Sequence, residues 1–118
     1  MTDNEINRAV CEKVLGWAHF QREPDSWWVD FKQVRTCATP DFCNDWAAFG
    51  ILWEHLAKTG ALPCLEIDSE AGGLHWGEPM ATVYGAADKN YPRVSYDPDP
   101  CRALAMAALK AHGVEDKL

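Results

Sequence analysis

The sequence has 118 residues, of which 47% are apolar, and its six tryptophans add to enough apolar mass for one small domain with its own core. This composition excludes a solvated, disordered chain. The formal net charge of −7 excludes sequence-independent binding to nucleic acid and binding to an anionic membrane, because both need clustered cations. It permits a basic partner protein.

The opening residues predict a helix over residues 3–15. Thr2 followed by Glu5 matches a capping box, in which each residue bonds the backbone of the other. Gly16 supplies a stop for the helix. The apolar residues at helical spacing are Ile6, Ala9, Val10, Val14 and Trp17.

Residues 18–26 are polar and contain Pro24, so they predict a loop. Aromatic and β-branched residues then favour a short strand at 27–31. Residues 32–43 predict a second irregular stretch, and loops of this length in a small domain are often functional.

A second helix is predicted over residues 44–59, capped by Asn44 or Asp41 and ended by Gly60. One apolar stripe is predicted to face the core. Its members are Trp46, Phe49, Trp53, Leu56 and Ala57.

Short strands and a last helix complete the pattern. Strands are predicted at 62–67, 74–76, 80–84 and 93–96, with a loop at 85–92; the segments 74–76 and 80–84 are either two strands or one strand bent at residues 77–79. Asp99 is a good N-cap and Pro100 suits a first helical turn, so a third helix is predicted over residues 100–112, ending at Gly113. Residues 114–118 predict a frayed tail.

These elements favour an α+β fold in a single domain over residues 1–118, a small αβα-sandwich with a mainly antiparallel sheet and about three helices. The strands follow one another too closely for repeated parallel crossovers. The residues expected to tie the helices to the sheet are Ile6, Val10, Val14, Trp46, Phe49, Trp53, Leu56, Leu104, Ala108 and Leu109.

The cysteines predict reduced thiols in a cytoplasm. Their number, five, is odd, no CxxC spacing occurs, and no signal peptide is recognised before them. They are Cys11, Cys37, Cys43, Cys64 and Cys101. No apolar run approaches the length that spans a membrane.

The strongest candidate site combines the starts of the second and third predicted helices. The N–H groups at helix starts have no helical partner and attract anions. Arg102 adds a fork suited to phosphate, Lys32 and Arg35 precede the second start, and aromatic side chains near loops can stack on a base. The predicted ligand-binding residues, for a small anionic nucleotide-like molecule, are Trp17, Trp27, Trp28, Arg35, Phe42, Asn44 and Arg102.

Each of these residues also has a purely structural explanation. Asn44 and Asp99 can simply cap their helices, and the carboxylates of Asp45 and Asp99 would repel a phosphate. Arg102 can pair with Asp97 or Asp99, and tryptophans more often belong to a core than to a stacking platform.

Other chemistry has less support. Cys43 or Cys101 at a helix start could be an activated thiol, and Cys37 with Cys43 could ligate zinc, although their five-residue gap is not a usual zinc spacing. The histidines that could join them are His19, His55 and His75. The sequence therefore predicts no catalytic residue, no metal and no cofactor. An exposed aromatic patch that anchors a protein, or a homo-oligomer, stays open.

Three short segments carry a family resemblance. They are 5–17, which ends in Gly-Trp, 40–47, an aromatic residue followed by a helix cap, and 99–105, an Asp-Pro-x-Arg-Ala helix start. In these segments the chain resembles the phage αβα-sandwich domain family and the related NinX-type phage proteins. The resemblance implies phage or prophage origin and action in the host cytoplasm, and it implies no reaction.

Two functions follow as hypotheses. The first is a non-catalytic phage accessory protein that binds and sequesters a small anionic nucleotide-derived ligand, in an anti-defence role. The alternative is an inhibitor or adaptor that binds a host protein.

Overall fold

A computed structural model of the chain describes residues 1–22, 25–29, 35–36, 38–67, 77–84 and 92–114. The elements are α1 (Asp3–Ala9), the π-helical turn η1 (Val10–Val14), β1 (Ala18–Arg22), β2 (Asp25–Val29), β3 (Arg35–Thr36), α2 (Trp46–Lys58), β4 (Cys64–Ile67), β5 (Pro79–Tyr84), β6 (Pro92–Tyr96) and α3 (Pro100–Ala111).

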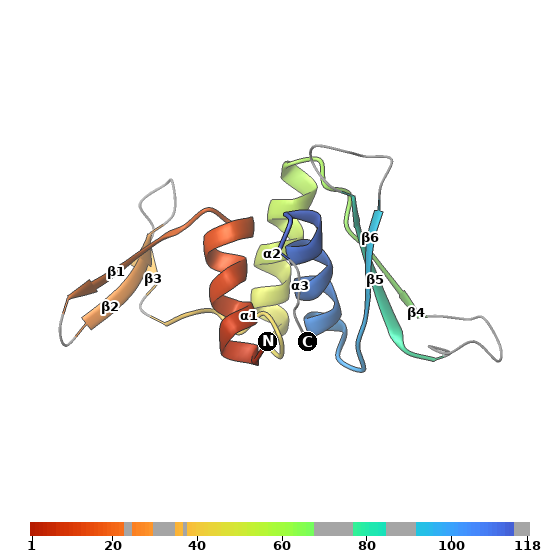
Figure 1. Cartoon of the computed structure of the whole chain (residues 1–118), viewed down its shortest axis with the longest axis horizontal. Helices are drawn as coiled ribbons and strands as arrows, with labels where there is room; N and C mark the ends of the chain where they lie inside the picture. Colours follow the sequence, from red (N-terminus) through yellow and green to blue (C-terminus); the bar gives the residue numbers. More distant parts are fainter. Residues whose placement is uncertain (23–24, 30–34, 37, 68–76, 85–91, 115–118) are drawn as a thin grey trace.

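The helices form the centre of an elongated molecule, and a small sheet lies at each end (Figure 1). The extents are 52 × 26 × 26 Å. Both sheets are antiparallel and three-stranded, with orders β1-β2-β3 and β4-β5-β6. The predicted α+β class is confirmed, but the strands form two sheets instead of one, because each pairs with its neighbours in the chain and α2 separates the two groups.

All three helices run in the same direction, so their starts lie at one end of the helical group and their ends at the other (Figure 1). Side-chain contacts agree with this: Arg102 at the start of α3 contacts Asp3 at the start of α1, and His55 near the end of α2 contacts the backbone of Val14 at the end of η1. Parallel helices place three positive dipole ends side by side.

The first predicted helix is correct in extent. The capping box forms, since the Thr2 hydroxyl accepts from the Glu5 amide and the Glu5 carboxylate accepts from the Thr2 amide. Its last turn is wider than an α-helix: Leu15 N–H donates to the Val10 carbonyl over 2.9 Å.

The third helix is the centre of the core. It packs against β5 and β6 on one side and against η1 and α2 on the other. Its alanines let these neighbours approach closely, and a continuous apolar core forms around them. The buried residues of α3 are Cys101, Ala103, Leu104, Ala105, Ala107, Ala108 and Leu109.

The second helix turns a different face to the core than its sequence suggests. Ala48, Leu52 and Leu56 are buried, whereas Trp46 is 59% exposed. Of the predicted stripe, Leu56 is confirmed as a core residue, Phe49 and Trp53 are only partly buried, and the prediction is wrong for Trp46 and Ala57, which are exposed. The smaller side chains allow α2 to lie close to α3. Asp45, and neither Asn44 nor Asp41, caps α2.

The predicted loop at 18–26 is corrected as well, because β1 and part of β2 lie there. Opposed aromatic side chains explain the pairing. His19 lies across from Trp28 with ring centroids 4.6 Å apart, and Phe20 lies across from Trp27 at 6.2 Å. Such cross-strand pairs stabilise a hairpin despite its polar neighbours.

The second sheet agrees with the strands predicted at 62–67, 80–84 and 93–96. Ala81 and Val83 of β5 are buried, and β4 forms an exposed edge. The strand predicted at 74–76 and most of the loop predicted at 85–92 lie outside the described residues.

No helix in the described part of the chain is long and apolar enough to cross a membrane. Four of the cysteines there are free thiols, in keeping with the predicted reduced state, and Cys37 lies outside the described residues.

Candidate functional site

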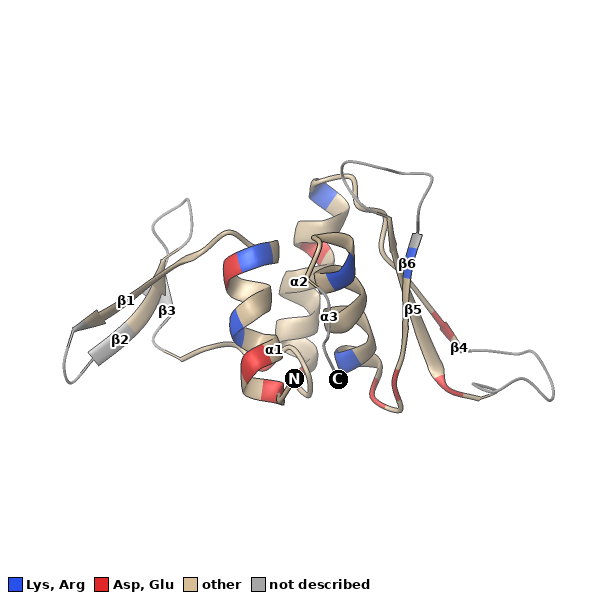
Figure 2. Cartoon of the chain, viewed as in Figure 1, with Lys and Arg blue, Asp and Glu red and all other residues tan. Residues whose placement is uncertain are grey.

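The starts of the three helices bring five carboxylates together, and we call this region the acidic end. Its carboxylates belong to Asp3, Asp41, Asp45, Asp97 and Asp99. Figure 2 shows red at the lower end of α1 and in the turn that leads into α3, and blue in the first turn of α3. The predicted convergence of the second and third helix starts is therefore present, but it is strongly acidic.

Arg102 is held inside this region by carboxylates. Its Nε donates to Asp3 at 3.1 Å and its Nη1 donates to Asp97 at 2.9 Å. Its Nη2 lies 3.5 Å from the Met1 carbonyl. Burial lowers the pKa of the guanidinium, but the hydrogen bond and charge of Asp97 and the charge of Asp3 outweigh this effect and raise it. The fork predicted to bind phosphate is thus occupied by this chain's own carboxylates.

Asn44 joins the same network. Its amide donates to Asp3 at 3.2 Å and to Asp41 at 3.2 Å, and Asp41 also accepts from Asn7 and from the Cys43 backbone N–H. Asp3 therefore connects Asn44 to Arg102, which are the two predicted site residues that the structure brings into one network.

The N-cap carboxylates of α2 and α3 accept hydrogen bonds from backbone amides that a bound phosphate would otherwise use. The Asp45 carboxylate accepts from Ala47 N–H at 3.0 Å, and the Asp99 carboxylate accepts from Cys101 N–H at 2.9 Å. Both helix starts thus carry a bound carboxylate of their own, in the place that a phosphate takes at an open helix start.

Two predicted stacking residues belong to the core, and this corrects their assignment. Phe42 is fully buried and Trp28 is 1% exposed. The Trp28 indole N–H donates to the Thr39 hydroxyl at 2.9 Å, and its ring lies against His19. Neither ring presents a face on which a base could stack, because other protein atoms cover both.

The other predicted residues lie apart from Arg102. Trp17 follows the end of η1, at the opposite end of the helices, and packs partly buried against the core. Trp27 lies in the outer hairpin and stacks with Phe20. Arg35 lies in β3 of the same sheet, and Lys32 lies outside the described residues. Among the described residues, the aromatic side chains predicted to stack on a base are therefore not gathered beside Arg102.

The thiols at the helix starts are not activated, because their pKa values are raised and not lowered. Burial raises the pKa of Cys43 to about 12, with the charges of Asp3 and Asp41 adding to the effect. Burial likewise raises the pKa of Cys101 to about 11, helped by Asp99. Within the described ranges no three His, Cys, Asp or Glu side chains are placed to hold a metal ion.

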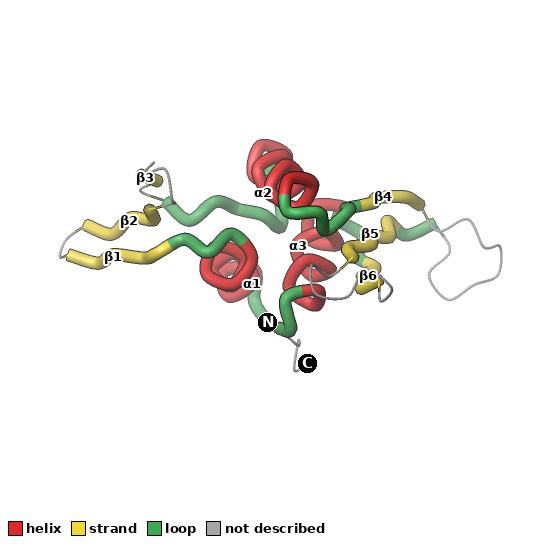
Figure 3. Tube along the Cα trace, turned by 90° about the horizontal axis from the view of Figure 1, so that it is seen from above, coloured by secondary structure: helices red, strands yellow, loops and turns green. Residues whose placement is uncertain are grey.

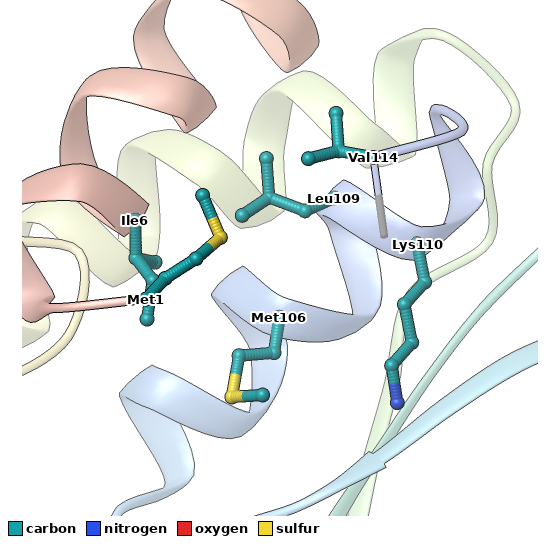
Figure 4. A pocket seen from close by; sticks show the side chains of 6 residues that line it. All are labelled: Met1, Ile6, Met106, Leu109, Lys110 and Val114. Carbon is teal, nitrogen blue, oxygen red and sulfur yellow. The ribbon is translucent and has the colours of Figure 1, made fainter. Parts of the chain in front are cut away.

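A shallow apolar hollow lies between α1 and α3 (Figure 4). The lining residues are Met1, Ile6, Met106, Leu109, Lys110 and Val114. The Lys110 amine donates to the Val94 carbonyl at 3.1 Å, which leaves apolar walls. The hollow is apolar apart from Lys110 and is distinct from the predicted site.

One flank of α2 carries a row of neighbouring rings, which we call the aromatic strip: Trp46, which is exposed, and Phe49 and Trp53, which are partly buried against the core. The Trp46 and Phe49 ring centroids lie 4.8 Å apart, and those of Phe49 and Trp53 lie 5.8 Å apart. Figure 3 shows α2 on one flank of the helical group, with α1 and α3 on the other side. From the sequence alone, the three residues of the strip are predicted to lie in the core. A second row of smaller apolar residues has the same helical spacing and could have indicated that a different face of α2 is buried. Its members are Ala48, Leu52 and Leu56.

Comparisons with known proteins find a similar fold and no similar sequence. No family model matches the chain, and no curated protein matches it. Among solved structures, a crystal structure of a phage protein from Bacillus cereus ATCC 14579 superposes with a TM-score of 0.65 at 13% identity, covering 99% of this chain and 93% of that chain. The two proteins share a fold. The finer resemblance to αβα-sandwich or NinX-type proteins stays a prediction.

Proposed function

We propose that this chain is a non-catalytic phage accessory protein that acts by docking on another protein through the aromatic strip. The fold shared with a phage protein supports the phage setting. The observation that carries the docking proposal is Trp46, which is 59% exposed and lies in ring contact with the partly buried Phe49.

Such a strip has the properties of an interface centre. Tryptophan is strongly enriched among the residues that carry most of the binding energy in protein interfaces. A helix places residues at spacings of three and four on one side, so the three rings form one row, in which Trp46 is exposed and Phe49 and Trp53 are partly buried against the core. Exposure of this apolar area to water is unfavourable, and a partner that covers it recovers that free energy.

Capture experiments test this proposal. The chain, fixed to a support, is incubated with lysate of a bacterial host, and bound proteins are compared between wild type, Trp46→Ser and Phe20→Ser. Phe20 is a matched control, because it is also a half-exposed aromatic residue and lies on the distant hairpin. We expect Trp46→Ser to lose a partner that Phe20→Ser retains. A partner retained equally by both variants would contradict docking through the strip.

Sequestration of a nucleotide-like anion is a second candidate, supported by the convergence of the α2 and α3 starts beside Arg102. The five carboxylates of the acidic end and the pairing of Arg102 with Asp3 and Asp97 weigh against it. A thermal-shift screen with nucleotides and cyclic dinucleotides tests it. A stabilisation lost in Arg102→Gln would support it, and no shift with any of them would contradict it.

A further inference from the structure

We infer that the partner of the aromatic strip presents a basic segment, in which arginine or lysine side chains meet the acidic end while apolar side chains cover the strip. This inference rests on the proposed docking function and names the chemistry of the partner. It follows from the position of the strip and from the charge beside it.

The strip begins at the acidic end. Asp45 caps α2 and Trp46 is the next residue, so the most exposed ring of the strip lies directly beside a cap carboxylate. The Asp45 backbone N–H donates to the Asp41 carbonyl at 2.9 Å, which places a second acidic residue behind it. A partner that covers Trp46 therefore also comes close to these carboxylates.

Three of these carboxylates keep their charge unpaired by any cation in the described contacts. Asp41 accepts from the amides of Asn7 and Asn44 and from a backbone N–H. Asp45 and Asp99 each accept from one backbone N–H of their own helix. All of these donors are uncharged, whereas the salt bridges of Arg102 go to the other two members of the acidic end.

The positive ends of the helix dipoles offset only part of the negative charge of the acidic end. Each helix start carries a positive partial charge of roughly one half, so three aligned starts offer about 1.5 charges. Five carboxylates exceed this amount even with Arg102 beside them. The acidic end thus has a negative excess that stabilising the helices does not need, and a cationic partner would offset it.

The negative charge of the acidic end disfavours a second copy of this chain as the partner that covers the strip. A second copy of this chain carries a net charge of −7 and would bring a second acidic end toward the first. A cation, by contrast, is attracted both to the carboxylates and to the face of an exposed indole, which is the preferred ring for cation–π contacts. Arginine also binds carboxylate in a bidentate manner.

Titration calorimetry with designed peptides tests the inference. The first probe is a short amphipathic helical peptide with leucines on one face and arginines beside them. Two matched peptides carry glutamine or glutamate at the arginine positions. At low salt we expect the arginine peptide to bind about tenfold more tightly than the glutamine peptide and the glutamate peptide to bind least. This preference should shrink at high salt, because mobile ions screen exposed charges.

Variants of the chain assign this preference to the acidic end. Asp45→Asn with Asp99→Asn keeps both helix caps while it removes two charges. We expect it to weaken the arginine peptide by about two- to fivefold per charge and to leave the glutamine peptide unchanged. Glu12→Gln is the matched control, because Glu12 is exposed in η1, away from the acidic end. It should bind all peptides as wild type does. Circular dichroism verifies that each variant is folded.

Each outcome decides a separate point. An arginine peptide that binds no better than the glutamine peptide, or equally well to the double variant, overturns the inference of a basic partner. If Trp46→Ser still weakens the peptides about tenfold in that case, docking through the strip survives. If Trp46→Ser has no effect on any peptide that binds, the docking proposal fails as well. Failure of all three peptides to bind also overturns the basic-segment inference.

Discussion

The Nε of Arg102 lies 3.1 Å from the carboxylate of Asp3, and this contact joins two residues that are 99 positions apart in the chain. It ties the first helix to the last one at the end where both begin. Nη1 of the same guanidinium lies 2.9 Å from Asp97, which precedes α3. Arg102 is thus a structural tie at the acidic end, and its removal leaves two carboxylates without their cation.

The first prediction concerns this tie. Arg102→Gln should lower the free energy of unfolding by about 2 kcal/mol, because hydrogen bonds to charged groups are lost and like charges stay close. Urea denaturation measures the change. Arg8→Gln is the control, since Arg8 forms an exposed pair with Glu12 at 3.7 Å and should change stability by less than about 0.5 kcal/mol. Equal effects of the two substitutions would contradict the structural role of Arg102.

The second prediction separates capping from charge at Asp45 and Asp99. Either residue changed to alanine should cost about 1 kcal/mol, because the hydrogen bond to the first turn is lost. Either residue changed to asparagine should be nearly neutral, since the amide oxygen still accepts that bond. Thermal unfolding of the four variants compares them. A loss with asparagine as large as with alanine would mean that the negative charge, and not the cap, stabilises the helix.

The third prediction tests which face of α2 is buried. Leu52→Ala should cost about 2–5 kcal/mol, because a fully buried side chain leaves a cavity. Trp46→Ala should cost less than about 1 kcal/mol, although tryptophan is much the larger side chain, since its ring is mostly exposed. Urea denaturation of both variants measures the order. The reverse order would place the aromatic strip in the core, as the sequence alone suggested.

The fourth prediction concerns pH. Burial lowers the pKa of His55 below its ordinary value of 6.5, and the charge of His112 adds to this effect while a hydrogen bond to the Val14 backbone opposes it. The unfolded chain therefore binds more protons at this site than the folded protein as the pH falls through 6.5. The free energy of unfolding should decrease with falling pH across this range.

His55→Gln should reduce this dependence, because the variant has no group there that titrates. The melting temperature of wild type and variant, measured on either side of pH 6.5, gives the comparison. Identical pH slopes in the two proteins would show that His55 does not contribute.

The helices were readable from sequence because their signals are local. Thr2 with Glu5 and Asp99 with Pro100 specify helix starts through contacts within one turn, and the structure has helices at both places. Capping chemistry depends on neighbours in the chain, so it needs no knowledge of the rest of the fold.

The orientation of α2 and the environment of Arg102 were not readable in this way. Both stripes of α2 have helical spacing, and the choice between Trp46 and Leu52 depends on how closely α3 approaches. Likewise, the pairing of Arg102 with Asp3 joins the two ends of the sequence. Contacts over such distances follow from tertiary packing, which overrides local pattern.

The fifth prediction uses the thiols as reporters of this packing. Thiolate is the reactive form of cysteine, and burial raises the pKa of Cys11 and Cys43 to about 12, so both should stay almost entirely protonated and covered at neutral pH. Cys64 is exposed on the edge strand β4. Brief iodoacetamide treatment followed by peptide mapping should therefore modify Cys64 and spare Cys11, Cys43 and Cys101 until urea unfolds the chain.

Because Cys43 and Cys101 lie at the α2 and α3 starts, their protection directly measures how tightly the acidic end is closed. Labelling of Cys43 at the rate of Cys64 in the folded protein would mean that this end opens, and the Arg102 network would then not be its stable state.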